Sequence, residues 1–357
     1  MSGKPILIDG SMGEGGGQVL RTTIALSAVT GVPVKIVNIR AKRKKPGLQR
    51  QHLTSVKAVA TLSNAMVKGL ELGSTTLEFY PRELRAGEFR FDIGTAGSVT
   101  LVFQAIMPLL PFLPGRTSIV VTGGTDVPWS PTVDYVRGVV VPLLSLMGLN
   151  VKVELIKRGH YPRGGGLVRY VVEDPPGRLE PLRIEKRGEI RMIRGLSHAT
   201  MLPPHVAERQ ARSAIEYLRE KLGDIRILVD LEKDPSGTRG IGPGSSIALW
   251  AICDHSVLGS DSLGEKGKPA EKVGMEAAMK LVEDLSTNAA LDRHMSDIII
   301  PMLALARGES VVTGSKLTLH ARTNIMVVEK ILGVEAKIEG REESFFKLTV
   351  RGKGVSR

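Results

Sequence analysis

A repeated pattern of strand, glycine turn and helix constrains this sequence of 357 residues more than any other feature. The stretch DGSMGEGGGQVLRTTIALSAVTG begins at Asp9 and reaches Arg21 twelve residues later. The stretch DIGTAGSVTLVFQAIMPLLPFLPG begins at Asp92 and reaches Gln104 at the same offset. Each is typical of a strand end, a glycine-rich turn and an aliphatic helix. The two stretches therefore predict an α/β unit that occurs more than once.

A second pair of similar stretches extends this repeat. Both LLSLMGLNVKVELIKRGHYPRGGGLVRYVVED and VEKILGVEAKIEGREESFFKLTV predict a helix, a Gly with a branched residue, and a hairpin of two strands. The helix expected after KPGLQRQHL fits the same pattern. We therefore expect three repeated units, the last near residues 285–357.

The segment 184–276 interrupts the repeat. It is more polar than its surroundings, contains the loop DPSGTRGIGPGSS and ends in SDSLGEKGKPAEKVG. We expect an inserted small domain at 184–276, and a large catalytic domain made of residues 1–183 and 277–357.

The overall composition is that of a globular protein with an aliphatic core, because 42% of residues are hydrophobic and only 4% are aromatic. The N-terminus runs directly into a strand pattern and no apolar run approaches eighteen residues, so we expect neither a signal peptide nor a membrane span. The lone Cys253 excludes a disulfide framework and favours the cytoplasm. Only five Asn and five Gln are present, as in many thermophilic proteins.

Positive charge is concentrated rather than scattered. The formal net charge is +12, and six of the eleven residues from Arg40 to Arg50 are Lys or Arg. Arg40 and Arg43 precede the Pro46-Gly47 turn, whereas Gln51 and His52 follow it at the start of a helix. A phosphodiester or triphosphate requires hydrogen-bond donors from several directions, and Arg can donate two hydrogen bonds at once to a phosphate. A solvated basic loop is the alternative, but it accounts poorly for Gln51-His52.

The run MGEGGGQVLR supplies a candidate metal ligand. Glycines ahead of a helix let the backbone approach an anion, although the run matches neither GxGxxG nor a P-loop. A tight turn is the simple interpretation. A carboxylate among the glycines, Glu14, makes a Mg²⁺ or Mn²⁺ ligand plausible, and Arg21 lies two helical turns further on.

Three further stretches carry candidate residues. The glycine-rich RGHYPRGGGLV predicts a hairpin loop whose Arg158, His160 and Arg163 add to a basic surface. In SKLTLHARTNI, His320 follows an alternating strand and precedes a helix, where it can present a neutral imidazole or serve only a structural role. In DRHMSDIIIPM, His294 and Asp297 open another helix, and Asp297 is equally explained as a first-turn acid.

Together these stretches resemble the RNA 3′-terminal phosphate cyclase family. The run RGHYPRGGGLV matches the family motif, and GEGGGQVLR, IRAKRKKPGLQRQHL, HMSDI and LHARTNI occur in family order over essentially the whole chain. The resemblance, to the archaeal or thermophilic cyclases in particular, implies ATP-dependent conversion of an RNA 3′-phosphate into a 2′,3′-cyclic phosphate. It implies a covalent histidine–AMP intermediate and then an RNA adenylate.

The resemblance also implies roles for individual residues. His320 would be the nucleophile, and Glu14 would bind Mg²⁺ or Mn²⁺. The phosphates of ATP and RNA would contact Arg21, Arg40, Arg43, Gln51 and His52. The nucleotide would contact Gln104, Pro131, His294, Met295, Ser296, Asp297 and Ile298. Many relatives have HLADQ where this chain has HMSDI. Ile298 thus stands where those relatives have Gln, and it cannot make the polar side-chain contact to the nucleotide that a Gln could make.

The implied fold is three repeated α/β units with a small α+β insert between the second and third. The implied partners are ATP and RNA 3′-phosphate ends, and no association with a membrane is expected. The sequence leaves open whether the protein forms a homo-oligomer. Three alternatives remain. They are the family's non-catalytic ribosome-assembly branch, which lacks the histidine, an enolpyruvate-transfer enzyme of related fold, and a general nucleic-acid-binding module.

Overall fold

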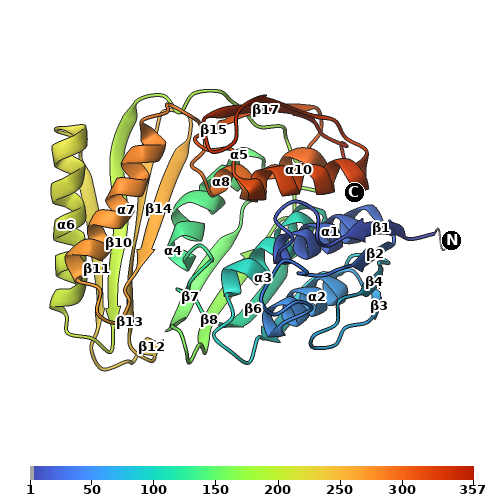
Figure 1. The fold of residues 1–357 in the computed structure, drawn as a ribbon, viewed down its shortest axis with the longest axis horizontal. Coiled ribbons are helices and arrows are strands. Elements are labelled where there is room, and N and C mark those ends of the chain that lie inside the picture. The colour runs from blue at the N-terminus through green and yellow to red at the C-terminus, as the bar shows by residue number, and fades with distance from the viewer. Residues whose placement is uncertain (1–3) are drawn as a thin grey trace.

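The computed structural model describes residues 4–357 and has a mixed α/β fold with four β-sheets. One continuous aliphatic core extends from Ile8 near the N-terminus to Val350 near the C-terminus. The two ends of the chain therefore share a core, and the blue and red parts of Figure 1 lie against each other. Within residues 4–357, no helix has the length and apolar character needed to cross a membrane.

The N-terminal sheet carries the first glycine turn. Its elements are β1 (Ile6–Asp9), α1 (Gly17–Thr30), β2 (Val34–Val37), α2 (Arg50–Leu62), β3 (Met66–Lys68) and β4 (Leu77–Tyr80). The strand order is β1-β2-β4-β3, with β1 and β2 parallel and the other pairs antiparallel. Because β1 ends at Asp9 and α1 begins at Gly17, Glu14 lies in the loop at the N-terminus of α1.

The second sheet contains the predicted hairpin. Its elements are β5 (Gly87–Asp92), α3 (Val99–Ile106), η1 (Met107–Phe112), β6 (Thr117–Gly123), α4 (Val133–Tyr135), η2 (Val136–Val140), α5 (Val141–Leu146), β7 (Lys152–Gly159), β8 (Gly166–Val172) and β12 (Gly240–Ile241). The strand order is β12-β7-β8-β6-β5. β7 and β8 pair antiparallel on either side of residues 160–165, which confirms the hairpin predicted from RGHYPRGGGLV.

The C-terminal sheet has the order β16-β17-β15-β9. Its elements are β9 (Arg183–Ile184), α8 (Met295–Ile298), α9 (Ile300–Leu305), β15 (Glu309–Gly314), α10 (Leu319–Leu332), β16 (Ala336–Gly340) and β17 (Phe346–Arg351). α10 packs against α1, although their sequences are about three hundred residues apart, and Figure 1 shows the two helices together. This packing brings the LHARTNI and GEGGGQVLR motifs to one place.

A fourth sheet lies at one end of the molecule (Figure 1). Its elements are β10 (Ile190–Thr200), α6 (His205–Leu222), β11 (Ile227–Asp234), β13 (Gly244–Cys253), β14 (Val257–Leu263) and α7 (Ala270–Leu285). The strand order is β11-β10-β13-β14, and α6 and α7 pack on each other and on the sheet. Residues such as Ile193, Leu218, Leu249 and Leu281 form a second hydrophobic cluster there. The predicted boundary at residue 276 falls inside α7, which continues as one helix to Leu285 because Ala277, Ala278 and Leu281 pack into this cluster.

Candidate active site

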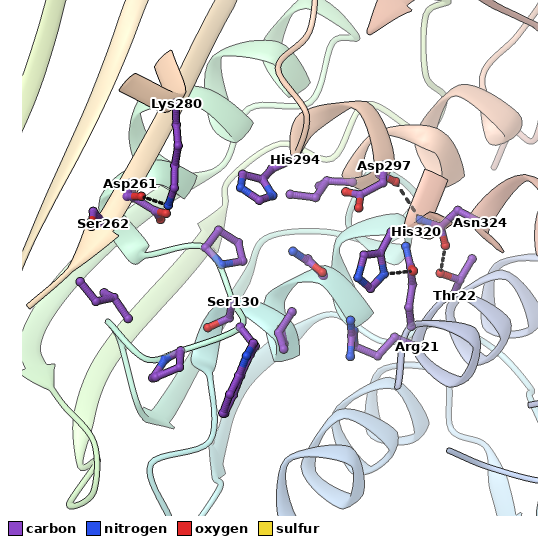
Figure 2. A pocket seen from close by; sticks show the side chains of 18 of the residues that line it. Arg21, Thr22, Ser130, Asp261, Ser262, Lys280, His294, Asp297, His320 and Asn324 are labelled. Atoms are coloured by element: carbon purple, nitrogen blue, oxygen red, sulfur yellow. Dashed lines mark hydrogen bonds between the residues drawn. The ribbon is translucent and has the colours of Figure 1, made fainter. Parts of the chain in front are cut away.

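A cavity of about 520 Å³ lies between the α1–α10 pair and the β14–α7 edge of the fourth sheet (Figure 2). Its wall combines three parts of the chain that are distant in sequence. It is lined by Gln18, Arg21, Thr22, Leu101, Gln104, Pro128, Trp129, Ser130, Pro131, Asp261, Ser262, Leu263, Glu265, Lys268, Glu276, Lys280, His294, Asp297, Ile298, Pro301, His320 and Asn324.

The first turn of α10 positions His320 at this cavity. Thr318 is the N-cap, and its hydroxyl accepts a hydrogen bond from the Ala321 amide, so the helix begins at Leu319. The expectation that His320 follows a strand is therefore wrong. Leu317 forms only an isolated bridge to Glu342, and the Thr318 cap starts the helix before the histidine. The histidine thus sits on a helix that is anchored against α1.

The imidazole of His320 is held in one neutral form. Its Nδ1 lies 2.7 Å from Oε1 of Gln18, a carbonyl oxygen that can only accept, so the ring proton is on Nδ1. Burial, together with the nearby Arg21, Arg43 and His294, lowers the pKa of His320 to about 4. At neutral pH the Nε2 atom therefore carries a free lone pair, and the side chain is still 48% exposed.

Arg21 lies on α1 one turn beyond Gln18 and also faces the cavity (Figure 2). Burial lowers the pKa of its guanidinium to about 10, which leaves it charged at neutral pH. Burial and the neighbouring Asp292 raise the pKa of Asp297 to about 8, although Arg21 acts against this rise. Arg21 therefore keeps its positive charge at neutral pH, whereas the carboxyl of Asp297 holds its proton to a higher pH than an ordinary aspartate.

Hydrogen bonds between distant segments fix this part of the cavity. Thr22 donates to Oδ1 of Asn324 at 2.6 Å, and Nδ2 of Asn324 donates to the carbonyl of Asp297 at 2.7 Å. These bonds join α1, α10 and α8 beside His320, as Figure 2 shows. The side chains of α1, α8 and α10 that face the cavity are therefore held together by hydrogen bonds.

Glu14 lies next to the imidazole, outside the main cavity wall. Its Oε2 is 3.7 Å from Nδ1 of His320, and its carboxylate forms an ion pair with Arg43. The Oε2 atom is buried and has no hydrogen-bond partner among residues 4–357. A Cβ atom at Gly16 would overlap this carboxylate, which explains the glycine at that position. A buried carboxylate oxygen without a donor fits a divalent cation.

His52 presents an N–H toward α1. It is the third residue of α2, and its Nδ1 accepts a hydrogen bond from the Gln49 amide, so the proton lies on Nε2. Burial, Arg21 and Arg40 lower the pKa of His52 to about 3. A Cβ atom at Gly17 would overlap Nε2 of His52 and lie 3.1 Å from Nη1 of Arg21. The glycine lets these two donors converge at the N-terminus of α1.

Arg40 and Gln51 make contacts within the protein. Nη1 of Arg40 donates to the carbonyls of Lys45 and Gly47 at 2.6 and 2.8 Å, which closes the basic loop. Oε1 of Gln51 accepts from the Ser98 amide at 2.7 Å, which ties α2 to the start of α3. The structure thus places both residues beside the site, where they position the loops that carry the other donors.

Five of the seven predicted nucleotide contacts line the cavity: Gln104, Pro131, His294, Asp297 and Ile298. Met295 and Ser296 do not, and they are 0% and 2% exposed. The Met295 amide donates to Asp292, and the Ser296 hydroxyl donates to the Asp292 carbonyl. Their side chains therefore support α8 rather than face the cavity.

Sequence reasoning missed the wall contributed by the fourth sheet. Asp261 of β14 and Lys280 of α7 face the cavity, and Nζ of Lys280 donates to the Asp261 carbonyl at 2.9 Å (Figure 2). The carboxylate of Asp261 accepts from the Thr132 amide at 2.8 Å and so holds the loop that carries Trp129. No local motif marks these residues, because the tertiary fold alone brings them to the site.

The predicted basic surface around RGHYPRGGGLV is wrong for two of its three members. Arg158 and His160 are 1% and 4% exposed, whereas Arg163 is exposed. The guanidinium of Arg158 is enclosed by ion pairs with Asp126, Asp134 and Glu232. Burial of this cation is possible because three carboxylates surround it.

Comparison with known proteins identifies the family of the chain. Residues 12–338 match the model of the family described as RNA 3′-terminal phosphate cyclase. The RNA 3′-terminal phosphate cyclase of Hyperthermus butylicus is 60% identical over 97% of this chain and 98% of its own length. The proteins of the same name from Ignicoccus hospitalis and Pyrobaculum aerophilum are 54% and 50% identical, over 97% and 99% of this chain and 98% and 99% of their own lengths. The chain therefore belongs to the RNA 3′-terminal phosphate cyclase family.

Proposed function

We propose that this protein uses ATP to convert an RNA 3′-terminal phosphate into a 2′,3′-cyclic phosphate, with His320 as the nucleophile. The observation that carries the proposal is the neutral imidazole of His320, whose proton is held on Nδ1 by Gln18 at the edge of a cavity. Such a ring presents a lone pair on Nε2 at neutral pH.

The reaction has three steps, and in each step one bond to phosphorus forms and another breaks. Nε2 of His320 attacks the α-phosphorus of ATP, a P–N bond forms, and pyrophosphate leaves. An oxygen of the RNA 3′-phosphate then attacks the same phosphorus, the P–N bond breaks, and the RNA carries AMP on its 3′-phosphate. Finally the neighbouring 2′-hydroxyl attacks the 3′-phosphorus and loses its proton, and AMP leaves as the ring closes.

We propose that the nucleotide occupies the cavity between His320 and the fourth sheet. Pro131 and His294 offer flat surfaces for a base, and Gln104 and Asp297 offer polar atoms. Ile298 is 8% exposed and supplies an apolar contact where many relatives have Gln. Met295 and Ser296 contribute through the position of α8, since their side chains are buried.

We propose that the phosphates lie at the N-terminus of α1, where fixed donors converge. Arg21 and the Nε2–H of His52 meet beside Gly17, and Arg43 lies beside Gly16. Arg40 and Gln51 position this surface through the bonds described above. Contacts of this kind hold a phosphate end without reading its sequence, so RNA ends of different sequence should be accepted.

Glu14 fits a divalent metal, Mg²⁺ or Mn²⁺, because its buried Oε2 lacks any donor among the described residues. A metal held there would neutralise charge on the polyphosphate and favour departure of pyrophosphate. Arg43 shares the carboxylate in the structure and holds its orientation toward His320.

We also propose that the molecule contains three repeated α/β units and one insert. Support comes from the order helix, strand, strand, which occurs as α2-β3-β4, as α5-β7-β8 and as α10-β16-β17. The fourth sheet with α6 and α7 has its own hydrophobic cluster, which supports an insert that ends at Leu285 rather than at residue 276.

The reaction is tested on a short RNA with a labelled 3′-phosphate. We expect ATP and Mg²⁺ or Mn²⁺ to give a product resistant to phosphatase, with one AMP released per RNA end. A matched RNA with a 2′-deoxy terminal sugar should stop at the adenylate, because no hydroxyl can close the ring. RNA binding without any phosphatase-resistant product would instead favour the non-catalytic branch of the family.

A further inference from the structure

Two histidines and an aspartate meet in a buried cluster away from the candidate active site. Asp126 follows β6, His160 follows β7, and His198 lies on β10 of the fourth sheet. One ligand atom from each of the three lies within 4.8 Å of the others, and the three residues are 4%, 4% and 0% exposed. The cluster thus joins the β7–β8 hairpin to the fourth sheet at a place closed to solvent.

The two imidazoles face each other through the same nitrogen. Nε2 of His160 lies 2.9 Å from Nε2 of His198. Burial, reinforced by Arg158, holds the pKa of His198 well below its ordinary value, and burial also lowers the pKa of His160. Two imidazolium rings would repel each other at this distance in a buried site, so at least one ring is neutral, which is the form in which histidine binds metals.

The proton of His198 is fixed on the opposite nitrogen. The Ser246 hydroxyl lies 3.0 Å from Oδ1 of Asp126 and 3.0 Å from Nδ1 of His198. A carboxylate can only accept, so the single hydroxyl proton goes to Asp126 and Nδ1 of His198 must be the N–H donor to Ser246. Nε2 of His198 then carries a lone pair that points at His160.

The proton of His160 has two available positions. If it lies on Nε2, it bridges the two rings, but Nδ1 is then a buried acceptor without a donor among residues 4–357. If it lies on Nδ1, that nitrogen is a buried donor without an acceptor among residues 4–357, and no proton lies between the two rings. Two Nε2 lone pairs then face each other and need a cation between them.

The charge of the surroundings also leaves room for a cation. Arg158 is paired with Asp126, Asp134 and Glu232, so three carboxylates surround one buried guanidinium. The only other cation paired with these carboxylates among residues 4–357 is Arg137, whose side chain is 47% exposed. Oδ2 of Asp126 accepts hydrogen bonds from Arg158 and Thr125, whereas Oδ1 accepts one from Ser246 and keeps a second lone pair for a further ligand.

We propose that Asp126, His160 and His198 bind one Zn²⁺ ion that fastens the fourth sheet to the β7–β8 hairpin. Imidazole nitrogens with one carboxylate suit zinc, whereas Mg²⁺ prefers oxygen ligands. A tetrahedral ion about 2.0–2.1 Å from each Nε2 holds these atoms roughly 3.3 Å apart, so the rings need to separate by only about 0.4 Å. Ser246 then holds His198 from outside the ligand set, as is usual for zinc histidines.

This site is distinct from the one proposed for Mg²⁺ or Mn²⁺ at Glu14, and its test does not depend on cyclase activity. The full chain is purified without chelators and its metal content is measured by mass spectrometry. We expect about one zinc per chain. The variants His160→Gln and His198→Gln should each lose it, whereas His255→Gln, which changes an exposed histidine in the turn between β13 and β14, should keep it.

A second measurement uses only wild-type protein, so it tests the proposal even if the histidine variants fail to fold. Wild-type protein is stripped with a chelator and titrated with ZnCl₂ or CoCl₂. We expect the melting temperature to rise until one equivalent is bound, and Co²⁺ to give visible absorption bands of a four-coordinate N/O site. Zinc-free wild type with no shift on titration would overturn the proposal and leave an N–H···N hydrogen bond between the rings. Equal zinc in wild type and both histidine variants would overturn it as well.

Discussion

The hydrogen bond from His320 to Gln18 makes the proposed nucleophile, His320, sensitive to a single charge at residue 18. Oε1 of Gln18 lies 2.7 Å from Nδ1 of His320. The substitution Gln18→Glu replaces this neutral acceptor by a carboxylate of nearly the same shape. A carboxylate beside an imidazole favours the imidazolium, so the pKa of His320 should rise from about 4.

The size of the rise follows from the geometry. Two unit charges about 4 Å apart interact by about 4 kcal/mol at an effective dielectric constant of about 20, which corresponds to about 3 pKa units. His320 is 48% exposed, and solvent screening of its charge reduces the expected rise to about 1–3 units. The pKa should then lie between about 5 and 7. Because only the neutral ring is nucleophilic, activity should be lost as the pH falls through this range.

The assay is self-adenylylation with α-labelled ATP, without RNA, from pH 4.5 to 8. Wild type should keep its rate down to about pH 5, whereas Gln18→Glu should lose activity at a pH about 1–3 units higher than wild type does. The matched control Gln18→Leu removes the hydrogen bond without adding charge. It should be about 2- to 13-fold slower at every pH, the equivalent of one hydrogen bond of about 0.5–1.5 kcal/mol. Identical pH profiles for wild type and Gln18→Glu would refute the proposed role of Gln18.

Three further substitutions test other parts of the site. Glu14→Gln should abolish the dependence of adenylylation on Mg²⁺ or Mn²⁺ concentration and slow the reaction on the order of 10²–10³-fold, and an unchanged metal titration would speak against Glu14 as ligand. Arg21→Lys keeps the charge but loses the planar fork, so we expect adenylylation to slow by about 10–100-fold, and a wild-type rate would mean that the fork is not used. Ile298→Gln restores the residue common in relatives, so the KM for ATP should fall by about 2- to 13-fold with kcat unchanged, and an unaltered KM would show that residue 298 does not touch the nucleotide.

Local sequence patterns were sufficient to predict those helices and hairpins whose structure is determined by neighbouring residues. The β7–β8 hairpin follows from strand periodicity around a glycine run, and α2 follows from the turn at Gly47 and the apolar face after Gln51. The grouping of His320 with Glu14 and Arg21 came from the family resemblance rather than from spacing. The structure adds the reason, since α1 packs against α10.

Long-range contacts explain what the sequence could not provide. Gln18 lies in the same glycine-rich run as Glu14, but its role depends on a contact with a residue 302 positions away. Asp261 and Lys280 reach the cavity only because β13 and β14 of the fourth sheet pack against α4 and η2. Arg158 looked like a surface cation because its carboxylate partners Asp126, Asp134 and Glu232 are spread over a hundred residues of sequence.

The most direct test of the account is chemical identification of the adenylylated atom. The protein is incubated with α-labelled ATP and Mg²⁺ or Mn²⁺ without RNA, digested under alkaline conditions, and the labelled peptide is sequenced by mass spectrometry. The account predicts one acid-labile, alkali-stable AMP on Nε2 of His320, and none on His320→Ala. AMP on any other residue, or a labelled His320→Ala protein, would contradict His320 as the nucleophile.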